Sequence, residues 1–361
     1  MNPQLFSLHE RLSSLGVDAL LFNTSELLSS TNLQYLSGFT GSDATMLVTR
    51  TERHLFTDGR YKTQAGQEAQ GFRVHVTRNK LASLIRMMTA VRLRKLGIES
   101  SRVSYEFVAH LTKRVPQLEI IPLQRGFIES LRIHKTAEER QKIREAAAIA
   151  SSACRKVIDG GLVGKKETEV AGELEALFRT AGAEAIAFDT IVASGERSAL
   201  PHGKASERTI GPNQPVVIDY GCRFQGYNSD ETVTCLTGSP SSEHAKIHQA
   251  VYDAHNKALD AAKVGVRARA LDTVARNSIE KAGYGKYFLH SLGHGVGMEV
   301  HEPPYLSPRG RGVLEEGMVF TIEPGIYIAG VGGVRLESLV FLERTGPELL
   351  SRMPKDLIVC G

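Results

Sequence analysis

The sequence predicts an α+β protein of two domains, in which a larger domain built from two similar halves follows a smaller α/β domain. Three observations predict this class. Residues 1–128 alternate helical and strand-like patterns, a helix-start signal marks a boundary near residue 130, and the remainder repeats a helix-plus-strand unit. The length of 361 residues also exceeds that of an ordinary single core.

The first part of the chain predicts helices alternating with short strands. A helical pattern of leucines, with Leu5, Leu8, Leu12 and Leu15, comes first. Apolar and β-branched runs then predict strands at 19–22, 44–48, 54–57 and 118–123. The last run is expected to close a domain of residues 1–128.

A capping box predicts where the second domain begins. Thr136 is followed three residues later by Glu139, and a long apolar-periodic stretch continues toward Val157. We therefore expect a helix that opens a domain of residues 130–361.

That second domain contains an internal repeat. Residues 163–182 and 264–283 each run from a Val-Gly pair to an Ala-Gly pair, at an offset of about 101 residues. Val170 aligns with Leu271, and strand-like sequence follows each helix. Ala-rich amphipathic helices also align by chance. Duplication is the favoured interpretation, and it predicts pseudo-twofold symmetry with a site at the seam.

Composition excludes several classes of function. The formal net charge is only +4 without a long basic stripe, which argues against nucleic-acid binding. Apolar runs stay well short of the roughly 20 residues that cross a membrane. The four cysteines form no Cys-x-x-Cys pair, and the N-terminus has no signal-peptide core, so a cytoplasmic location is expected.

Two predicted hairpins carry the candidate chemistry. Folding residues 216–234 about the turn at 223–226 places Asp219 opposite Asp230. Folding residues 318–341 about Gly330 places Glu323 opposite Glu337. A single buried carboxylate is usually a hydrogen-bonded structural acid. Two facing pairs would need several kcal/mol of compensation, which a dinuclear metal centre supplies.

A glycine-rich segment supplies the candidate imidazole ligand. His294 lies between Gly293 and Gly295, which let metal and backbone approach closely, and His290 and His301 flank it. Carboxylates with one imidazole suit two divalent ions. Hard oxygen ligands favour Mn²⁺, while Co²⁺, Zn²⁺ and Fe²⁺ also fit.

These residues resemble the metallopeptidase family that contains methionine aminopeptidase, aminopeptidase P and prolidase, with its pita-bread fold. The resemblance rests first on Asp219 and Asp230, which are eleven residues apart. It rests also on three later segments, residues 293–297, 323–325 and 333–337. Segments 188–195 and 201–203 are similar to the Xaa-Pro branch. Weaker similarity at 35–42 and 56–61 implies a creatinase-type N-terminal domain.

The resemblance implies a function and a set of roles. It implies hydrolysis of the bond between an N-terminal residue and proline by a metal-bridging hydroxide, with Glu323 as both ligand and proton shuttle. His202 and His301 would hold the substrate and stabilise the oxyanion, His290 would line the substrate side, and Arg335 would orient Glu337 or the substrate. The five metal ligands would be Asp219, Asp230, His294, Glu323 and Glu337. A homodimer, whose partner N-terminal domain walls the pocket, is expected by the same resemblance.

Three departures from the family pattern bear on specificity. Val233 occupies a position where family members often have Arg, and Ser338 occupies one where they commonly have an acidic residue. Residues 303–305 occupy the place where many prolidase-like sequences have Arg. The last departure shifts weight from strict dipeptidase toward aminopeptidase. The alternatives are a broader aminopeptidase, a metal-free creatinase-like C–N hydrolase, and a non-enzymatic binding protein on the same fold; the complete ligand set argues against the last two.

Overall fold

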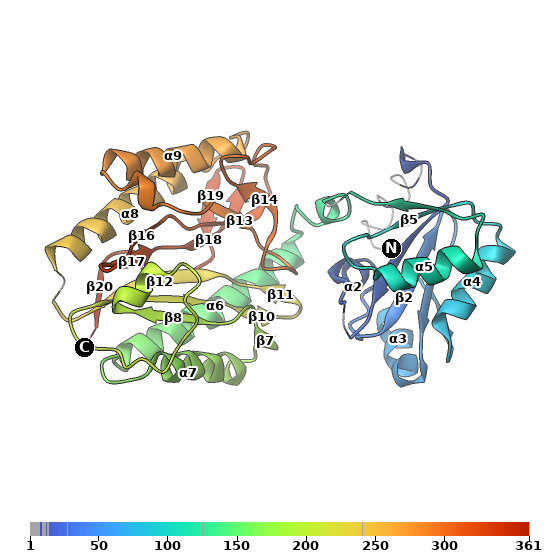
Figure 1. Ribbon diagram of the computed structural model, residues 1–361, viewed down its shortest axis with the longest axis horizontal. Helices are drawn as coiled ribbons and strands as arrows, with labels where there is room; N and C mark the ends of the chain where they lie inside the picture. Colours follow the sequence, from blue (N-terminus) through green and yellow to red (C-terminus); the bar gives the residue numbers. More distant parts are fainter. Residues whose placement is uncertain are drawn as a thin grey trace. The chain divides into compact units, whose positions relative to one another are not determined.

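The computed structural model describes residues 8, 12, 14–26, 28–124, 126–239 and 241–360. The chain divides into two compact units, Met1–Leu131 and Arg132–Gly361, each with cores of its own (Figure 1). Most of the leucine helix predicted around Leu5 to Leu15 lies outside the described residues. No helix within the described ranges combines the length and apolar content that a bilayer crossing requires.

The N-terminal unit is built on one mixed sheet of six strands, in the order β4-β3-β2-β1-β5-β6. The strand bounds are β1 Ala19–Thr24, β2 Ala44–Thr49, β3 Arg53–Thr57, β4 Arg73–Val76, β5 Lys95–Ile98 and β6 Glu119–Pro122. The helices are α2 Thr31–Ser37, α3 Lys62–Glu68, α4 Lys80–Ala90 and α5 Tyr105–Arg114, with 3-10 turns at Gly59–Tyr61 and Glu129–Leu131. The four predicted strands are confirmed as β1, β2, β3 and β6.

Side chains of β1 alternate between two cores. Leu20 and Phe22 pack in one core with Leu33 of α2. Leu21 packs in the other core with Leu84 of α4. Because successive side chains of a strand point to opposite faces, this continuous apolar run buries both faces of the sheet.

The C-terminal unit places helix pairs over strands. Its helices are α6 Ala137–Asp159, α7 Glu167–Thr180, α8 Ser242–Ala261 and α9 Ala268–Lys281, with 3-10 turns at Gly195–Ala199 and Gly285–Tyr287. Its strands are β7 Ala185–Ile186, β8 Ile191–Ser194, β9 Pro215–Tyr220, β10 Cys222–Phe224, β11 Tyr227–Asn228, β12 Glu231–Thr237, β13 Gly293–Gly295, β14 Glu302–Leu306, β15 Val319–Ile322, β16 Gly325–Ile328, β17 Gly332–Arg335, β18 Ser338–Glu343, β19 Gly346–Leu349 and β20 Ile358–Cys360. The predicted capping box is confirmed, since Thr136 and Glu139 exchange hydrogen bonds at the start of α6.

The predicted internal repeat is confirmed in the fold. Helices α7 and α9 have the same length and are offset by the expected number of residues. The amides of Gly164 and Gly265, ahead of the two helices, donate to the carbonyls of Ile210 and Leu314 at 2.9 and 2.8 Å. The two halves therefore repeat both the helix and the hydrogen bond that joins the loop before it to a later segment.

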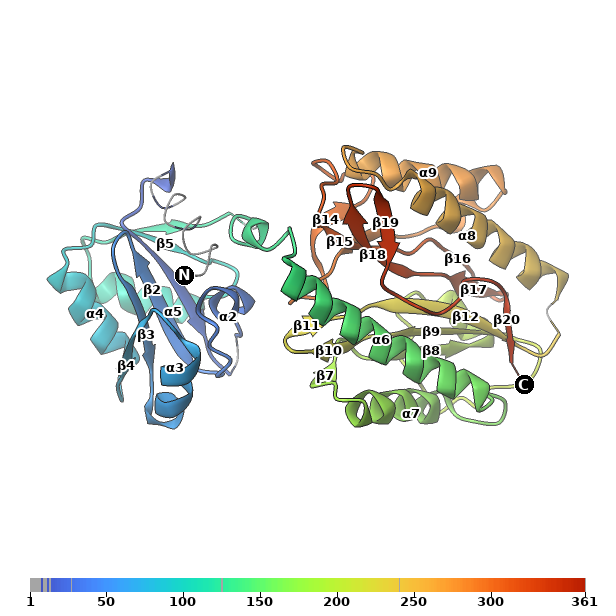
Figure 2. The same ribbon diagram turned by 180° about the vertical axis from the view of Figure 1, so that it is seen from behind.

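Each half has its own sheet and core. The first sheet has the order β20-β12-β9-β8 and packs against α6 and α7, and the second has the order β14-β13-β15-β18-β19 and packs against α8 and α9. In Figures 1 and 2, α7 lies along one border of these strands and α8 with α9 along the opposite border. The smaller sheets β16-β17 and β11-β10-β7 complete the unit.

Candidate metal centre

The first two acidic residues lie on the hairpin that joins β9 to β12. The chain turns at Gln225 and Gly226, whose φ angles of +48° and +81° suit a two-residue hairpin turn. The turn is centred one residue later than predicted, so Asp219 pairs with Thr232. The predicted direct pairing of Asp219 with Asp230 is therefore wrong by two positions. Because side chains alternate with period two, the two acids keep a common face as diagonal neighbours.

The second acidic pair has the predicted register. Glu323 and Glu337 lie in the short gaps between strands, and the pairs that flank them share one register: Ile322 with Ser338, and Gly325 with Arg335. The turn contains Gly330 in the left-handed region, at φ +77°. The Glu337 amide donates to the Thr232 carbonyl at 3.0 Å, which joins this hairpin to the first one.

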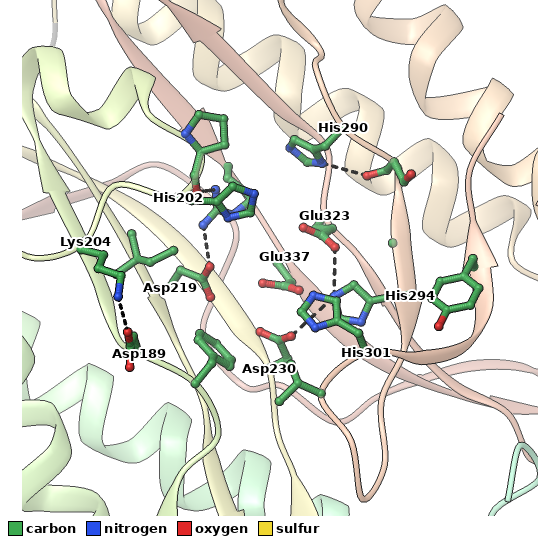
Figure 3. A pocket seen from close by; sticks show the side chains of 18 residues that line it. Asp189, His202, Lys204, Asp219, Asp230, His290, His294, His301, Glu323 and Glu337 are labelled. Atoms are coloured by element: carbon green, nitrogen blue, oxygen red, sulfur yellow. Dashed lines mark hydrogen bonds and ion pairs between the residues drawn. The ribbon is translucent and has the colours of Figure 1, made fainter. Parts of the chain in front are cut away.

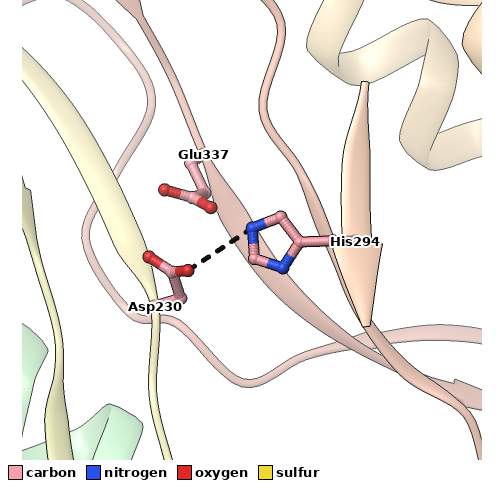
Figure 4. A group of neighbouring side chains, drawn as sticks. All are labelled: Asp230, His294 and Glu337. Carbon is pink, nitrogen blue, oxygen red and sulfur yellow. Dashed lines mark ion pairs between the residues drawn. The ribbon is translucent and has the colours of Figure 1, made fainter. Parts of the chain in front are cut away.

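His294 of β13 brings an imidazole to the acids. Its Nε2 lies 3.3 Å from Glu323 Oε1 and 3.7 Å from Asp230 Oδ2. Asp230, His294 and Glu337 each offer one ligand atom within 4.8 Å of one another (Figure 4). These three side chains could therefore hold one metal ion.

The two glycines beside His294 allow this approach. A Cβ added at Gly293 would lie 2.0 Å from the Thr321 carbonyl oxygen, and one at Gly295 would lie 2.2 Å from the Pro303 carbonyl oxygen. A side chain at either position would push β13 away from its neighbouring strands. The glycines thus place the imidazole of His294 among the acids.

Electrostatics at the centre favour a bound cation. Burial, and next the neighbouring Glu337, raises the pKa of both Asp230 and Glu323 well above the usual range. Burial and then Asp219 raises the pKa of Glu337 to about 8. Burial lowers the pKa of His294 to about 4, which keeps its imidazole in the neutral form that ligates metals. A cation among these groups would remove the repulsion that raises the acid pKa values.

Asp219 is held by an arginine and keeps one oxygen free for a ligand. Arg335 Nη2 donates to Asp219 Oδ2 at 2.6 Å. The other oxygen, Oδ1, is buried and has no hydrogen-bond partner among the described residues. A buried carboxylate oxygen without a partner is costly, and a metal ion is a fitting partner for it. The donor set present here therefore fits a divalent ion.

Three hydroxyl-bearing residues that the sequence interpretation did not name also support the centre. Thr232 Oγ1 donates to Glu337 Oε2 at 2.6 Å, and Thr321 Oγ1 donates to Glu323 Oε1 at 3.2 Å. Tyr327 Oη accepts from Arg335 Nη1 at 2.9 Å. Thr232 follows Asp230 by two residues on one strand, so strand periodicity could have placed it on the same face.

The acids form the floor of a pocket of about 490 Å³ (Figure 3). Its lining includes all five predicted ligands together with His202, His290, His301 and Arg335. The ring centroids of His301 and His294 are 4.1 Å apart. The structure thus brings together on one pocket every residue that the sequence placed at the site.

His290 is fixed by protein partners on both ring nitrogens. Its Nε2 lies 2.9 Å from Tyr327 Oη, and its Nδ1 lies 2.8 Å from the Ser291 carbonyl. The Asp272–Arg276 pair of α9 holds the loop that carries it: Arg276 Nη2 donates to the His290 carbonyl at 2.9 Å, and Asp272 Oδ1 accepts from the Leu292 amide at 3.1 Å. With both ring nitrogens engaged, His290 presents ring carbons rather than a free donor or acceptor to the pocket.

Comparison with known proteins then decides the family. The model of "Metallopeptidase family M24" matches residues 141–344, and that of the "Creatinase/Prolidase N-terminal domain" matches residues 5–134. The chain belongs to metallopeptidase family M24. This confirms the resemblance seen in the sequence, and family membership makes the chain a divalent-metal-dependent exopeptidase.

M24 relatives match this chain over nearly its whole length. It is 38% identical to an uncharacterised peptidase of Bacillus subtilis and 39% identical to a Xaa-Pro dipeptidase of Pyrococcus horikoshii, in both cases over 99% of each chain. The structure of a Xaa-Pro dipeptidase from Bacillus anthracis is similar with a TM-score of 0.94 at 36% identity, over 99% of each chain. That of an X-Pro aminopeptidase from Thermotoga maritima gives 0.90 at 38% identity, over 97% of this chain and 99% of that one. The predicted two-domain fold is confirmed.

The three departures from the M24 pattern have structural counterparts. Val233 is fully buried in the core beneath the first sheet. Ser338 Oγ lies 2.9 Å from Nε2 of the buried His255, so the serine has a protein partner where an acid is common. Tyr305 lines the pocket and is 41% exposed. Of the three, only Tyr305 is placed where it can affect substrate choice.

Proposed function

We propose that this M24 peptidase hydrolyses the bond between an N-terminal residue and a following proline. The observation that carries the proposal is the crowding of four acids and one imidazole at the floor of a pocket. The relatives support the substrate class, since full-length matches at 36–39% identity are named Xaa-Pro dipeptidase and X-Pro aminopeptidase.

We assign the ligands as Asp219, Asp230, His294, Glu323 and Glu337, holding two divalent ions, with Mn²⁺ expected. Three of them already offer ligand atoms within one ion's reach. The unpartnered Oδ1 of Asp219 supports a further ligand beyond these three. Oxygen-rich ligand sets favour Mn²⁺, and Co²⁺, Zn²⁺ or Fe²⁺ are the alternatives.

The residues around the ligands would keep them in place during the reaction. When bound, the ions would supply Lewis acidity that lowers the pKa of water toward neutrality and polarises the scissile carbonyl. Arg335 and Thr232 hold the carboxylates of Asp219 and Glu337 in fixed orientations. Among the described residues, the guanidinium group of Arg335 makes four hydrogen bonds to protein groups, which favours orienting Asp219 over binding substrate.

Proton transfer and substrate binding are assigned to the remaining pocket residues. Glu323 has a raised pKa and is suited to take a proton from the attacking water and to pass it to the leaving amine. His202 and His301 are proposed to donate to substrate oxygens and to stabilise the oxyanion. His290 would shape the wall against which the substrate packs. The floor acids would also attract the free amino group, which explains cleavage near an N-terminus.

One assay tests the proposal. The metal-free protein is incubated with Mn²⁺ and then with the dipeptide Ala-Pro or with a longer Xaa-Pro-Xaa peptide. Cleavage of the dipeptide alone assigns a dipeptidase, and cleavage of both assigns an aminopeptidase. Cleavage of peptides without proline would favour the broader aminopeptidase. Absence of any Xaa-Pro cleavage with metal present would contradict the proposal, and hydrolysis of creatine-like substrates without metal would favour the creatinase-like alternative.

The assembly and the cellular location are also proposals. Resemblance to the family supports a homodimer, and sedimentation that finds only monomer would contradict it. Each of the four cysteines is a buried free thiol, which suits a cytoplasmic location.

A further inference from the structure

We propose that Lys204 binds the free C-terminal carboxylate of an Xaa-Pro dipeptide, and that Asp189 weakens this contact by competing for the same ammonium group. The inference rests on the proposed Xaa-Pro peptidase function and names the substrate end that the site selects. Lys204 and Asp189 both line the pocket whose floor carries the acids.

The position of Lys204 connects it to the substrate side of the pocket. It follows Gly203 and His202, and Figure 3 shows it on the flank of the pocket next to Asp219 and His202. Its Nζ lies 2.6 Å from Asp189 Oδ2. The side chains of Lys204 and Asp189 are 77% and 70% exposed, so a substrate can reach the ammonium group.

The charges in the pocket leave Lys204 as the cation available to a ligand. The other arginine or lysine of the lining is Arg335, which is 4% exposed and binds Asp219, Thr232, Tyr327 and the Pro201 carbonyl. The ammonium group of Lys204 has three donors, and an ion pair as exposed as that with Asp189 is weak. A substrate carboxylate can therefore share or displace Asp189 at small cost.

A dipeptide has the complementary charges. Its ammonium group is attracted to the acidic floor, and its carboxylate follows within about 7 Å, the reach of two extended residues. In a longer peptide the proline carbonyl belongs to a neutral amide, which gains less from Lys204 than a carboxylate does. This charge difference would make the site prefer dipeptides.

Two substrates that differ in one charge test this inference. The kcat/KM of the Mn²⁺-loaded protein is measured for Ala-Pro and for its C-terminal amide, Ala-Pro-NH2. Wild type should prefer Ala-Pro by up to about fivefold, the upper size expected of one exposed ion pair. Lys204→Met should remove most of that preference through a higher KM for Ala-Pro, with a smaller effect on cleavage of the amide. Asp189→Asn should increase the preference.

A matched variant controls for the change in net charge. Lys166 is another exposed lysine with an acidic partner, Glu207 at 2.8 Å, and it is outside the pocket lining, so Lys166→Met should leave both substrates unaffected. Equal cleavage of the two substrates by wild type, or an equal loss for both in Lys204→Met, would overturn the role of Lys204 while the peptidase assignment stands. If wild type cleaves neither substrate, the proposed function fails and the inference fails with it.

Discussion

Thr232 donates a hydrogen bond of 2.6 Å to the Glu337 carboxylate, and both side chains are buried. The two residues belong to different halves of the pseudo-symmetric unit, so this bond crosses the seam between them. Thr232 Oγ1 also lies 3.2 Å from Arg335 Nε, and Arg335 in turn holds Asp219. One hydroxyl therefore links a proposed ligand of one half to a proposed ligand of the other.

Removing that hydroxyl should weaken metal binding. Thr232→Val keeps the side-chain shape but leaves Glu337 without its donor, and loss of a group that orients a ligand typically reduces metal affinity by about 10-fold. Titration of Mn²⁺ into metal-free protein by calorimetry measures the effect. Thr237→Val is the matched control, because Thr237 is buried on the same strand and donates to the Gly211 carbonyl at 2.7 Å. An equal change in Mn²⁺ affinity for the two variants would argue against the orienting role.

A buried ion pair should stabilise the segment that carries His301. Lys135 Nζ lies 2.6 Å from Glu302 Oε1, and both side chains are 1% exposed. Among the described residues, Lys135→Met would leave the Glu302 carboxylate with the Arg132 contact at 3.3 Å as its remaining ion pair. Loss of one partner from a buried pair costs about 3 kcal/mol in the free energy of unfolding, which urea denaturation can measure.

An exposed lysine provides the comparison for this variant. Lys142 pairs with Glu138 one helical turn away, and the Glu138 side chain is 79% exposed. Lys142→Met should therefore change the free energy of unfolding by less than about 0.5 kcal/mol. If both methionine variants lose the same stability, burial does not make the Lys135–Glu302 pair more stabilising than an exposed pair.

The buried His248 should make the protein sensitive to acid. Burial lowers its pKa to about 4 from the ordinary value of 6.5, and its Nε2 has no hydrogen-bond partner among the described residues. Below pH 6.5 the unfolded chain binds a proton that the folded chain does not bind until about pH 4. Stability is thus lost as the pH falls through this window, by about 2–3 kcal/mol from this residue.

His248→Leu should remove that contribution. The difference in unfolding free energy between the variant and wild type should shift in favour of the variant as the pH is lowered from 7 toward 4. Chemical denaturation at several pH values measures this difference. A difference that stays constant across the range would mean that His248 titrates alike in the folded and unfolded chains.

The sequence was sufficient to predict the repeat and nine of the residues that line the pocket. Val-Gly and Ala-Gly pairs at a constant offset mark the two halves, and folding about Gly330 gives the observed register for Glu323 and Glu337. The turn between β10 and β11 was harder to place. Phe224 and Gln225 lie between Arg223 and Gly226, and the left-handed conformations of Gln225 and Gly226 centre the turn one residue later than predicted.

Residues that act through others were not predictable in the same way. Thr232, Thr321 and Tyr327 have no charge pattern of their own. Thr232 contacts Glu337 and Tyr327 contacts His290 across long stretches of the chain, whereas Thr321 contacts Glu323 two residues away. Because side chains alternate along a strand, the spacing of two residues from Asp230 could have suggested that Thr232 lies on the same face. Tyr327, by contrast, becomes relevant only when the fold brings Arg335 and His290 to it.

Removal of metal should abolish activity reversibly. The floor acids are crowded and their charged forms are disfavoured without a cation, so a chelator should eliminate Ala-Pro hydrolysis and Mn²⁺ should restore it. Metal binding should also raise the thermal midpoint of unfolding. If the chelator leaves the thermal midpoint of unfolding unchanged, the ions do not bind the folded site tightly.

The most direct test is a count of bound ions in active protein. Elemental analysis of purified protein that hydrolyses Ala-Pro should find about two divalent ions per chain, and Asp219→Asn and Glu337→Gln should each reduce that number together with the activity. Full activity in protein that contains no divalent ion would contradict the assignment of the four acids and His294 as a metal centre.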